Sequence, residues 1–280
     1  MDHNMNGIFV PLLTTQAGRS LTFANWHEVD IKNVALDLSA LLVKPGFEFL
    51  KNLSSLASYM GWDGNIILNA SFLNRNVQDG YFVRSEYDGS RRHYSFNDIL
   101  SLIVKLKPTG VLLPEGFHEQ DKTAWLSLSS NTLPFFHPKD IHACSEQRPY
   151  GVYFILEDGE SLTIVQQKIE ALKDIPCLII GDLNLAVFQQ LTALGVRYLA
   201  SDRPALDACQ GVVYSSKGQL ALTDDNIRSD FRVIDEHCSC PTCIQKLTRA
   251  YLCHLFEHTP LLCQRFLIQH NIYFMNHLAF

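Results

Sequence analysis

The chain has 280 residues, of which 47% are hydrophobic and 19% are charged, and its formal net charge is −6. This composition is typical of a globular protein with a sizeable core, and it excludes an intrinsically disordered chain. The negative charge excludes a global basic field, so any contact with RNA would depend on a local cluster of basic residues.

Neither a membrane span nor a secretory signal is predicted. No run of 18 or more apolar residues is present, and the first residues lack a positive segment followed by a long apolar stretch. The eight cysteines do not form the dense framework of a small secreted domain. We therefore expect a protein that does not enter the membrane and that has a cytoplasmic location.

Apolar runs alternate with amphipathic segments along most of the chain. In chain order, the pattern predicts a strand at 7–13, an ambiguous apolar segment at 34–43, a helix at 47–61, a strand at 65–72, a hairpin at 79–96 that turns at Asp88-Gly89, and a helix at 95–108. A strand at 110–116, a strand at 151–159, a helix at 161–174, a strand at 176–182, a helix at 185–196 and a strand at 197–201 follow. This alternation predicts parallel α/β units and favours a trimmed (β/α)₈ TIM-like barrel.

Three cysteines are clustered in the sequence HCSCPTC, at Cys238, Cys240 and Cys243. Thiolates at this spacing can converge on one ion, and zinc takes four ligands in a tetrahedron. A closed shell of four protein ligands leaves no open position, so the predicted ion has a structural role. The spacing alone leaves four downstream candidates for the fourth ligand, which are His254, His258, His270 and His277.

The composition changes after Asp235, where cysteines and histidines become frequent. We therefore expect a barrel domain over residues 1–235. Residues 236–280 are expected to form a zinc-binding subdomain that ends in a closing helix.

The cysteine motif, followed 27 residues later by His270, resembles the zinc signature of the tRNA-guanine transglycosylases, the queuine and archaeosine tRNA-ribosyltransferase family. Segments 42–68, 83–99, 178–201 and 211–243 resemble the same family in the same order. The resemblance covers most of the chain. It implies a (β/α)₈ barrel with a C-terminal zinc subdomain, in which His270 completes the ligand set of one structural zinc ion.

For function, the resemblance implies exchange of a guanine base in tRNA for a 7-deazaguanine, on the pathway to queuosine or archaeosine. One Asp attacks the ribose C1′ to form a covalent intermediate, and a second Asp transfers protons. The chain departs from the family at both positions, which are occupied by Asn69 and Ala200. The glycine-rich substrate loops of the family have no clear counterpart between residues 150 and 180. These departures predict a shortened, catalytically degenerate paralogue.

The first functional hypothesis is therefore a non-catalytic paralogue that docks tRNA or pairs with a partner subunit. The partner would be a second copy of the chain or a full-length transglycosylase. Candidate phosphate contacts are Lys246, Arg249 and Arg265, with Lys217 and Arg228 nearby.

Two alternatives stay open. One is an active base-exchange glycosyltransferase with a rebuilt site, in which Asp202 replaces the nucleophile and Glu115 or another carboxylate transfers protons. Against it, we favour a solvated or loop-capping role for Asp202. The resemblance also implies an Asp that recognises the base, at the end of a further strand, and Glu115 and His118 are candidate remnants of that residue. The other alternative is a small-molecule binder that uses the barrel mouth, to which Trp62 and Asp63 would contribute, although for Trp62 we favour a packing role.

Overall fold

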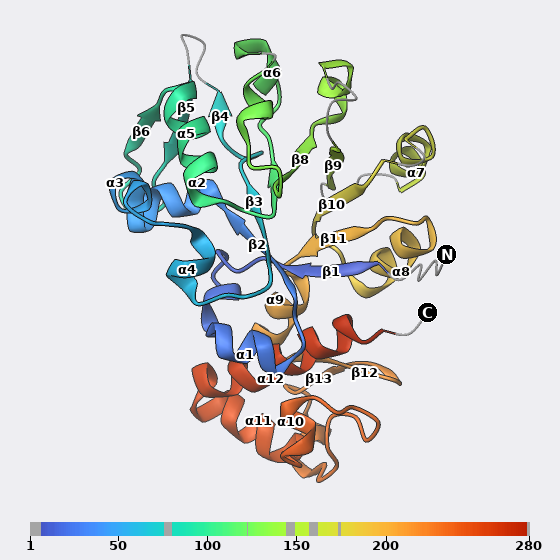
Figure 1. The fold of residues 1–280 in the computed structure, drawn as a ribbon. Helices are drawn as coiled ribbons and strands as arrows, with labels where there is room; N and C mark the ends of the chain where they lie inside the picture. Colours follow the sequence, from blue (N-terminus) through green and yellow to red (C-terminus); the bar gives the residue numbers. More distant parts are fainter. Residues whose placement is uncertain are drawn as a thin grey trace.

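The structure is a computed structural model that describes residues 7–75, 80–121, 123–143, 149–156, 162–172 and 175–278. Its centre is a sheet of eight strands in the order β1-β11-β10-β9-β8-β7-β3-β2, in which every pairing is parallel. The edge strands β1 and β2 are joined by a bridge between Leu12 and Ala35, so the barrel is nearly closed (Figure 1). The strands are β1 (Ile8–Pro11), β2 (Asn33–Asp37), β3 (Asn65–Asn69), β7 (Gly110–Leu112), β8 (Leu133–Phe136), β9 (Gly151–Leu156), β10 (Cys177–Gly181) and β11 (Tyr198–Ser201).

The interior of the barrel is filled by side chains, because every strand contributes at least one inward-facing apolar residue. These residues are Val10, Ala35, Ile67, Leu112, Phe135, Tyr153, Leu178, Ile180 and Ala200. Successive residues of a strand face opposite sides, so the intervening residues point outward to the helices. The barrel is therefore a packed core, and a ligand would bind at one of its ends.

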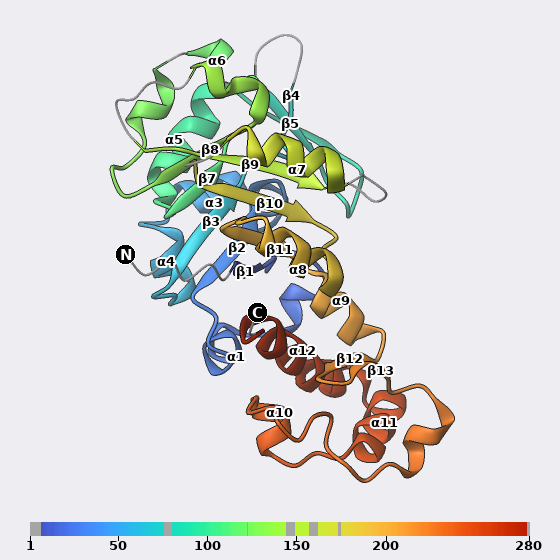
Figure 2. The ribbon, with the colours of Figure 1, turned by 90° about the vertical axis from the view of Figure 1, so that its right-hand side faces the viewer.

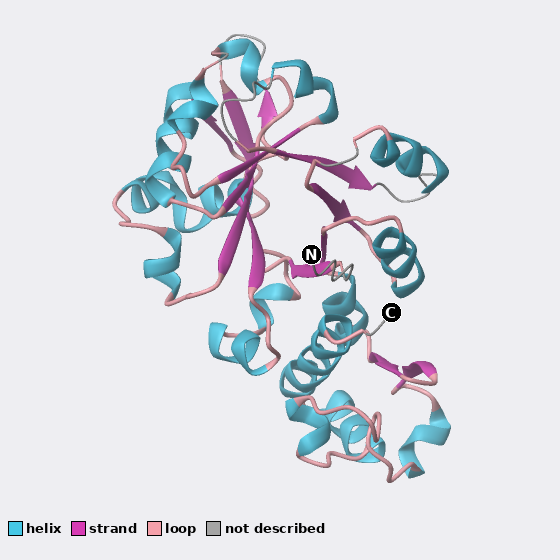
Figure 3. Cartoon of the chain, turned by 45° about the vertical axis from the view of Figure 1, so that its right-hand side comes forward, coloured by secondary structure: helices cyan, strands magenta, loops and turns pink. Residues whose placement is uncertain are grey.

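Helices surround the strands on the outside of the barrel (Figure 3). They are α1 (Phe23–Glu28), α2 (Leu38–Leu41), α3 (Phe47–Lys51), α4 (Leu56–Met60), α5 (Phe96–Leu106), α6 (Phe117–Gln120), α7 (Leu162–Glu170), α8 (Leu185–Ala193) and α9 (Arg203–Cys209). Shorter 3₁₀ or π turns cover Gly18–Ser20, Leu42–Gly46, Ala124–Ser127, Pro138–Ala143 and Asp225–Ser229. A small antiparallel sheet, β4 (Asn74–Arg75), β5 (Tyr81–Arg84) and β6 (Arg91–Tyr94), follows β3.

The C-terminal elements form a separate layer beside the barrel (Figure 2). They are the hairpin of β12 (Val212–Ser215) and β13 (Gly218–Ala221), followed by α10 (Pro241–Ile244), α11 (Arg249–His258) and α12 (Pro260–Asn276). The side chain of Asn271 in α12 is fully buried, and its amide donates to the carbonyl oxygens of Pro204 and Val212. Its oxygen accepts from the backbone N–H of Tyr214. One side chain thus joins α12 to α9 and to the hairpin.

The predicted fold class is confirmed, and most predicted strands and helices are present. The strand β8 was missing from the prediction, and the ambiguous segment 34–43 contains both β2 and α2. The predicted helix 47–61 is two helices, because Ser55 caps α4 by accepting a hydrogen bond from the N–H of Ser58. Ser161, the first residue of the predicted helix 161–174, lies outside the described residues. The division of the chain at residue 235 stays a prediction.

No helix in the described part of the chain is long and apolar enough to cross a membrane.

We predict that Asn271→Ala lowers the free energy of unfolding by about 2–4 kcal/mol, because two carbonyl oxygens and one N–H lose their buried partner. Urea denaturation followed by circular dichroism measures the change. Arg265→Ala, at an exposed position of the same helix, is the control and should change the value by about 0.5 kcal/mol or less. Equal effects of the two substitutions would contradict the anchoring role of Asn271.

Candidate metal centre and barrel-mouth site

Three elements bring four metal-ligating side chains together near the C-terminus. Cys238 lies in the loop before α10, Cys240 directly precedes that helix, Cys243 lies within it, and His270 lies in α12. The three Sγ atoms and one ring nitrogen all lie within 4.8 Å of one another. His270 Nδ1 lies 3.7, 3.3 and 3.4 Å from the Sγ atoms of Cys238, Cys240 and Cys243.

These distances fit a tetrahedral ion. Zinc bonds of about 2.3 Å to sulfur and about 2.0 Å to nitrogen, at tetrahedral angles, place sulfur and nitrogen roughly 3.5 Å apart. Of the four candidate histidines, His270 is the one that the described structure brings to the thiols. His254 and His258 contact each other on the exposed side of α11, and His277 stacks on Tyr273.

Further contacts orient the ligands of this cluster. His270 is fully buried, and its Nε2 lies 2.6 Å from the carbonyl oxygen of Tyr214, so Nδ1 is left to face the thiols. The backbone N–H groups of Cys240 and Cys243 donate to the Sγ atoms of Cys238 and Cys240. Hydrogen bonds from the neighbouring Cys240 and Cys243 side chains hold the pKa of Cys238 well below its usual range. The arrangement favours the thiolate, the form that binds metals, at Cys238, whereas hydrogen bonds with Cys238 and Cys240 raise the pKa of Cys243.

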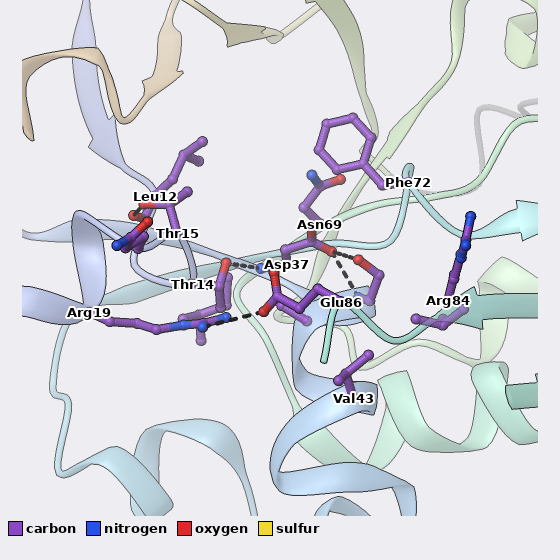
Figure 4. Close-up of a pocket in the computed structure, with 15 residues that line it drawn as sticks. Leu12, Thr14, Thr15, Arg19, Asp37, Val43, Asn69, Phe72, Arg84 and Glu86 are labelled. Carbon is purple, nitrogen blue, oxygen red and sulfur yellow. Dashed lines mark hydrogen bonds and ion pairs between the residues drawn. The ribbon is translucent and has the colours of Figure 1, made fainter. Parts of the chain in front are cut away.

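A second site is a cavity at the barrel mouth, where the carboxyl ends of β1, β2 and β3 meet the loop after β5 (Figure 4). Its lining consists of Leu12, Thr14, Thr15, Gln16, Arg19, Leu36, Asp37, Ser39, Ala40, Val43, Asn69, Phe72, Val83, Arg84 and Glu86. The carboxyl ends of barrel strands are the usual location of ligand sites in this fold. The cavity is thus the place where chemistry or binding would be expected.

Asp37 and Asn69 lie side by side in this cavity, because β2 and β3 pair in a register that matches the two residues. Each is held in the same way by a serine two residues later. Ser39 donates its N–H and its hydroxyl to Asp37 Oδ1, both at 2.8 Å. Ser71 donates in the same way to Asn69 Oδ1, at 3.0 and 2.6 Å. Burial raises the pKa of Asp37, and the hydrogen bonds from Ser39 offset only part of this effect.

Ala200, at the family's nucleophile position, and Asp202, its candidate replacement, lie in different surroundings. The side chain of Ala200 is 1% exposed and belongs to the apolar layer inside the barrel. Strand β11 ends at Ser201, so the alternation of a strand does not extend to Asp202, which precedes α9. Burial raises the pKa of Asp202, and a hydrogen bond from Thr15 opposes the shift. Asp202 is therefore a partly buried carboxylate next to a residue of the mouth cavity.

The remaining predicted mouth residues do not line this cavity. Glu115 follows β7 and forms an ion pair with Lys139 at 2.7 Å, which lowers the pKa of its carboxyl. His118 is buried, with Nδ1 3.2 Å from Asp140 Oδ1. Trp62 stacks on His27 and precedes the start of β3, so it and the adjacent Asp63 lie at the amino ends of the strands. The expectation that these two residues contribute to the mouth is wrong, because parallel strands put them at the opposite end.

The candidate phosphate contacts differ in their surroundings. Lys246, Arg265 and Lys217 are exposed, and Arg228 forms an exposed ion pair with Glu257. By contrast, Arg249 contacts Asp230 and the carbonyl oxygens of Val233 and Ile234 through its three guanidinium nitrogens. The tRNA-contacting role of Lys246, Arg249 and Arg265 stays a prediction.

Sequence reasoning missed Asp37 and its cavity. The signal that could have found it is the repeated motif of an Asx residue followed two positions later by serine, at Asp37 and at Asn69. In each case the motif begins at the last residue of a buried strand, which is where the side chains of a parallel barrel converge.

The chain is similar to known proteins over nearly its whole length. Residues 151–279 match the family model described as Queuine tRNA-ribosyltransferase. The chain is 23% identical to the queuine tRNA-ribosyltransferase of Thermoanaerobacter pseudethanolicus, over 96% of this chain and 83% of that protein. The corresponding protein of Halothermothrix orenii is 24% identical with the same coverage. The resemblance that the motifs indicate is thus confirmed.

We predict that Arg249→Ala lowers the free energy of unfolding by about 2–4 kcal/mol, because Asp230 and two carbonyl oxygens lose a nearly buried partner. The matched control is Arg228→Ala, which removes an exposed ion pair and should cost about 1 kcal/mol or less. Denaturant titration measures both values. A cost for Arg249→Ala no larger than that of the control would refute the structural role.

Proposed function

We infer that this chain, which carries the queuine tRNA-ribosyltransferase domain, is a tRNA-guanine transglycosylase-like protein of tRNA base modification that no longer exchanges bases by the family's mechanism. In this proposal it acts on the route to queuosine-type 7-deazaguanine bases as a non-catalytic paralogue. It would dock tRNA or pair with a partner subunit, in the cytoplasm.

The observation that carries this proposal is the place of Ala200. The resemblance puts the family's nucleophile at this position, and here a methyl group lies in the packed interior of the barrel. A methyl group cannot attack the ribose C1′. The amide of Asn69 stands at the acid/base position and cannot transfer a proton near neutral pH. Both halves of the two-carboxylate chemistry are therefore missing at the family's own positions.

A pairing role is supported by the surface of the C-terminal segment, residues 212–276, which runs from β12 to α12. Half of the large hydrophobic residues that the described chain exposes lie in this segment, and Leu261 is 82% exposed. They are Phe231, Ile244, Tyr251, Leu261 and Leu262. Exposed apolar side chains mark an interaction surface where they form one contiguous patch, which is what this proposal requires of them. In this proposal they contact a second copy of the chain or a full-length transglycosylase, while Lys246 and Arg265 contact tRNA phosphates.

The same proposal assigns one structural zinc ion to Cys238, Cys240, Cys243 and His270. These residues fit the ion in number, chemistry and spacing. The ion would supply a cross-link between α10 and α12 and no reactivity. Since Asn271 follows His270 directly, the cross-link would also fix the part of α12 that contacts the barrel.

A second candidate function is an active base-exchange glycosyltransferase that uses Asp202. The partly buried setting and raised pKa of this carboxylate, next to Thr15 of the mouth cavity, are the observations that favour it. Asp202 directly precedes α9, but its side chain makes no hydrogen bond that caps this helix, and the hydrogen bond that its carboxylate accepts comes from Thr15.

Base exchange is the direct test. We predict that purified protein incorporates no labelled guanine or 7-deazaguanine into bulk tRNA above the level without protein. A full-length transglycosylase added to the same tube must incorporate label, which shows that the tRNA and the base are competent. Incorporation by this chain that Asp202→Asn abolishes would overturn the proposal in favour of the rebuilt active site.

For the metal, we predict about one zinc ion per chain by mass spectrometry of the purified protein. Cys240→Ser should reduce this content to well below half and destabilise the C-terminal segment, because metal binding contributes directly to folding. Cys177→Ser changes a buried cysteine of β10 that is outside the cluster and should leave the zinc content unchanged. A Cys240→Ser protein that is fully folded without zinc would refute the assignment.

A further inference from the structure

A second cavity, with a volume of about 290 Å³, lies on the outside of the barrel among the helices α1, α2 and α4, whose places are shown in Figure 1. Its apolar walls include Leu21, Phe23, Trp26, Leu41 and Met60, which belong to the layer between the strands and the helices. None of its lining residues belongs to the apolar layer inside the barrel. This outer cavity is therefore separate from the packed interior, and no role has been assigned to it.

Several apolar side chains of the outer cavity are only partly covered. Phe23, Leu41 and Met60 are half-buried, and the ring of Tyr59 at the rim is 49% exposed. The floor, by contrast, is closed, since Trp26 is 1% exposed. An apolar group that enters the cavity would be removed from water together with these walls, which is the main source of affinity in small-molecule sites. The walls therefore favour a ligand with an apolar body.

Two cations, Arg19 and Lys44, are the charged side chains that line the outer cavity. Both contact the exposed side chain of Tyr87, in the turn after β5. Arg19 donates to its hydroxyl oxygen at 3.5 Å, and Lys44 Nζ lies 5.7 Å from its ring centroid. Glu86 lies 3.6 Å from Arg19, whereas Lys44 has no ion-pair partner within the described residues. One ring thus holds both cations at the same rim of the cavity.

The charge at this rim favours an anion with a single charge. Two basic side chains and the carboxylate of Glu86 leave one net positive charge there. A carboxylate head group matches this charge, and Arg19 and Lys44 would donate charge-assisted hydrogen bonds to it. A doubly charged phosphate would exceed the positive charge, and a neutral head group would not form such bonds. Apolar walls below a cationic rim therefore fit an amphipathic carboxylate.

We propose that the outer cavity binds a small, free monocarboxylic acid with an aliphatic tail. The tail contacts Phe23, Leu41 and Met60, and the carboxylate accepts hydrogen bonds from Arg19 and Lys44. The ligand lies directly behind the wall of the barrel mouth, because the two cavities share Arg19. The site requires neither zinc nor tRNA, so it goes beyond the proposed docking function and can be tested apart from it.

Calorimetric titration of the full chain with octanoate, below the concentration at which it forms micelles, tests the proposal. We expect saturable binding of one octanoate per chain. 1-Octanol keeps the tail and lacks the charge, so it should bind at least about fivefold more weakly. Butyrate keeps the head group and shortens the tail, so it should bind at least about tenfold more weakly.

Lys44→Gln tests the cationic rim. It should weaken the binding of octanoate at least about fivefold and change that of 1-octanol less than about twofold, because only octanoate carries the charge that Lys44 binds. Lys51→Gln is the matched control, since Lys51 Nζ lies 5.8 Å from the ring centroid of Phe47 in the same way, but outside the outer cavity. It should change neither Kd by more than about twofold.

Tyr59→Ala tests the apolar rim and should weaken the binding of octanoate and of 1-octanol alike, by about fivefold or more. Its matched control is Phe49→Ala, which removes the other member of the same exposed ring pair, with centroids 5.3 Å apart, and lies outside the cavity. All four substituted side chains are exposed, so we expect folded variants, which circular dichroism checks.

Three results would overturn the proposal: no saturable binding of octanoate to the wild-type chain, equal affinity for octanoate and 1-octanol, or cavity variants that bind as well as their controls. Sedimentation velocity of the same proteins covers the competing occupant. Dimerisation that Tyr59→Ala abolishes and Phe49→Ala preserves would assign the outer cavity to a second copy of the chain and would also overturn the proposal.

Discussion

The parallel pairing of the eight strands is the constraint on which both the barrel and its candidate mouth site depend. Parallel strands that share one direction bring their carboxyl ends to the same edge, and the register of β2 with β3 puts Asp37 beside Asn69. A shift of one residue in this register would turn every side chain of the strand to the other face. The apolar layer inside the barrel resists such a shift, because it requires one inward-facing residue from each strand.

The mouth and the barrel interior illustrate how a fold can persist while its chemistry changes. Ala200 belongs to the packed interior, so its methyl group contributes to stability without any role for a carboxylate at that point. Asp37 and Asn69 are each held by a serine two residues later, within the same loop. These two residues can therefore be exchanged individually, since each loop supports its own side chain.

Much of the fold and of the metal cluster could be predicted from the sequence, because both have local signals. Alternating apolar segments predict strands and helices, and the spacing of Cys238, Cys240 and Cys243 indicates a tight loop around an ion. The mouth cavity could not be predicted, because Asp37 and Phe72 meet only through strand pairing and through the packing of the hairpin after β3. Arg249 is similar: its basic side chain suggests a phosphate contact, but three nearby oxygen atoms surround it in the folded chain.

The contacts of Asn271 also constrain the order in which the chain can complete its fold during synthesis. Its amide reaches Val212, which is 59 residues earlier in the sequence. At a translation rate of about 5–20 residues per second, α9 and the β12–β13 hairpin wait roughly 3–12 s on the ribosome before this partner exists. During that interval the backbone groups that α12 later covers remain accessible to water and to chaperones. The packing of α12 against α9 and the hairpin is thus a late step in the folding of the chain.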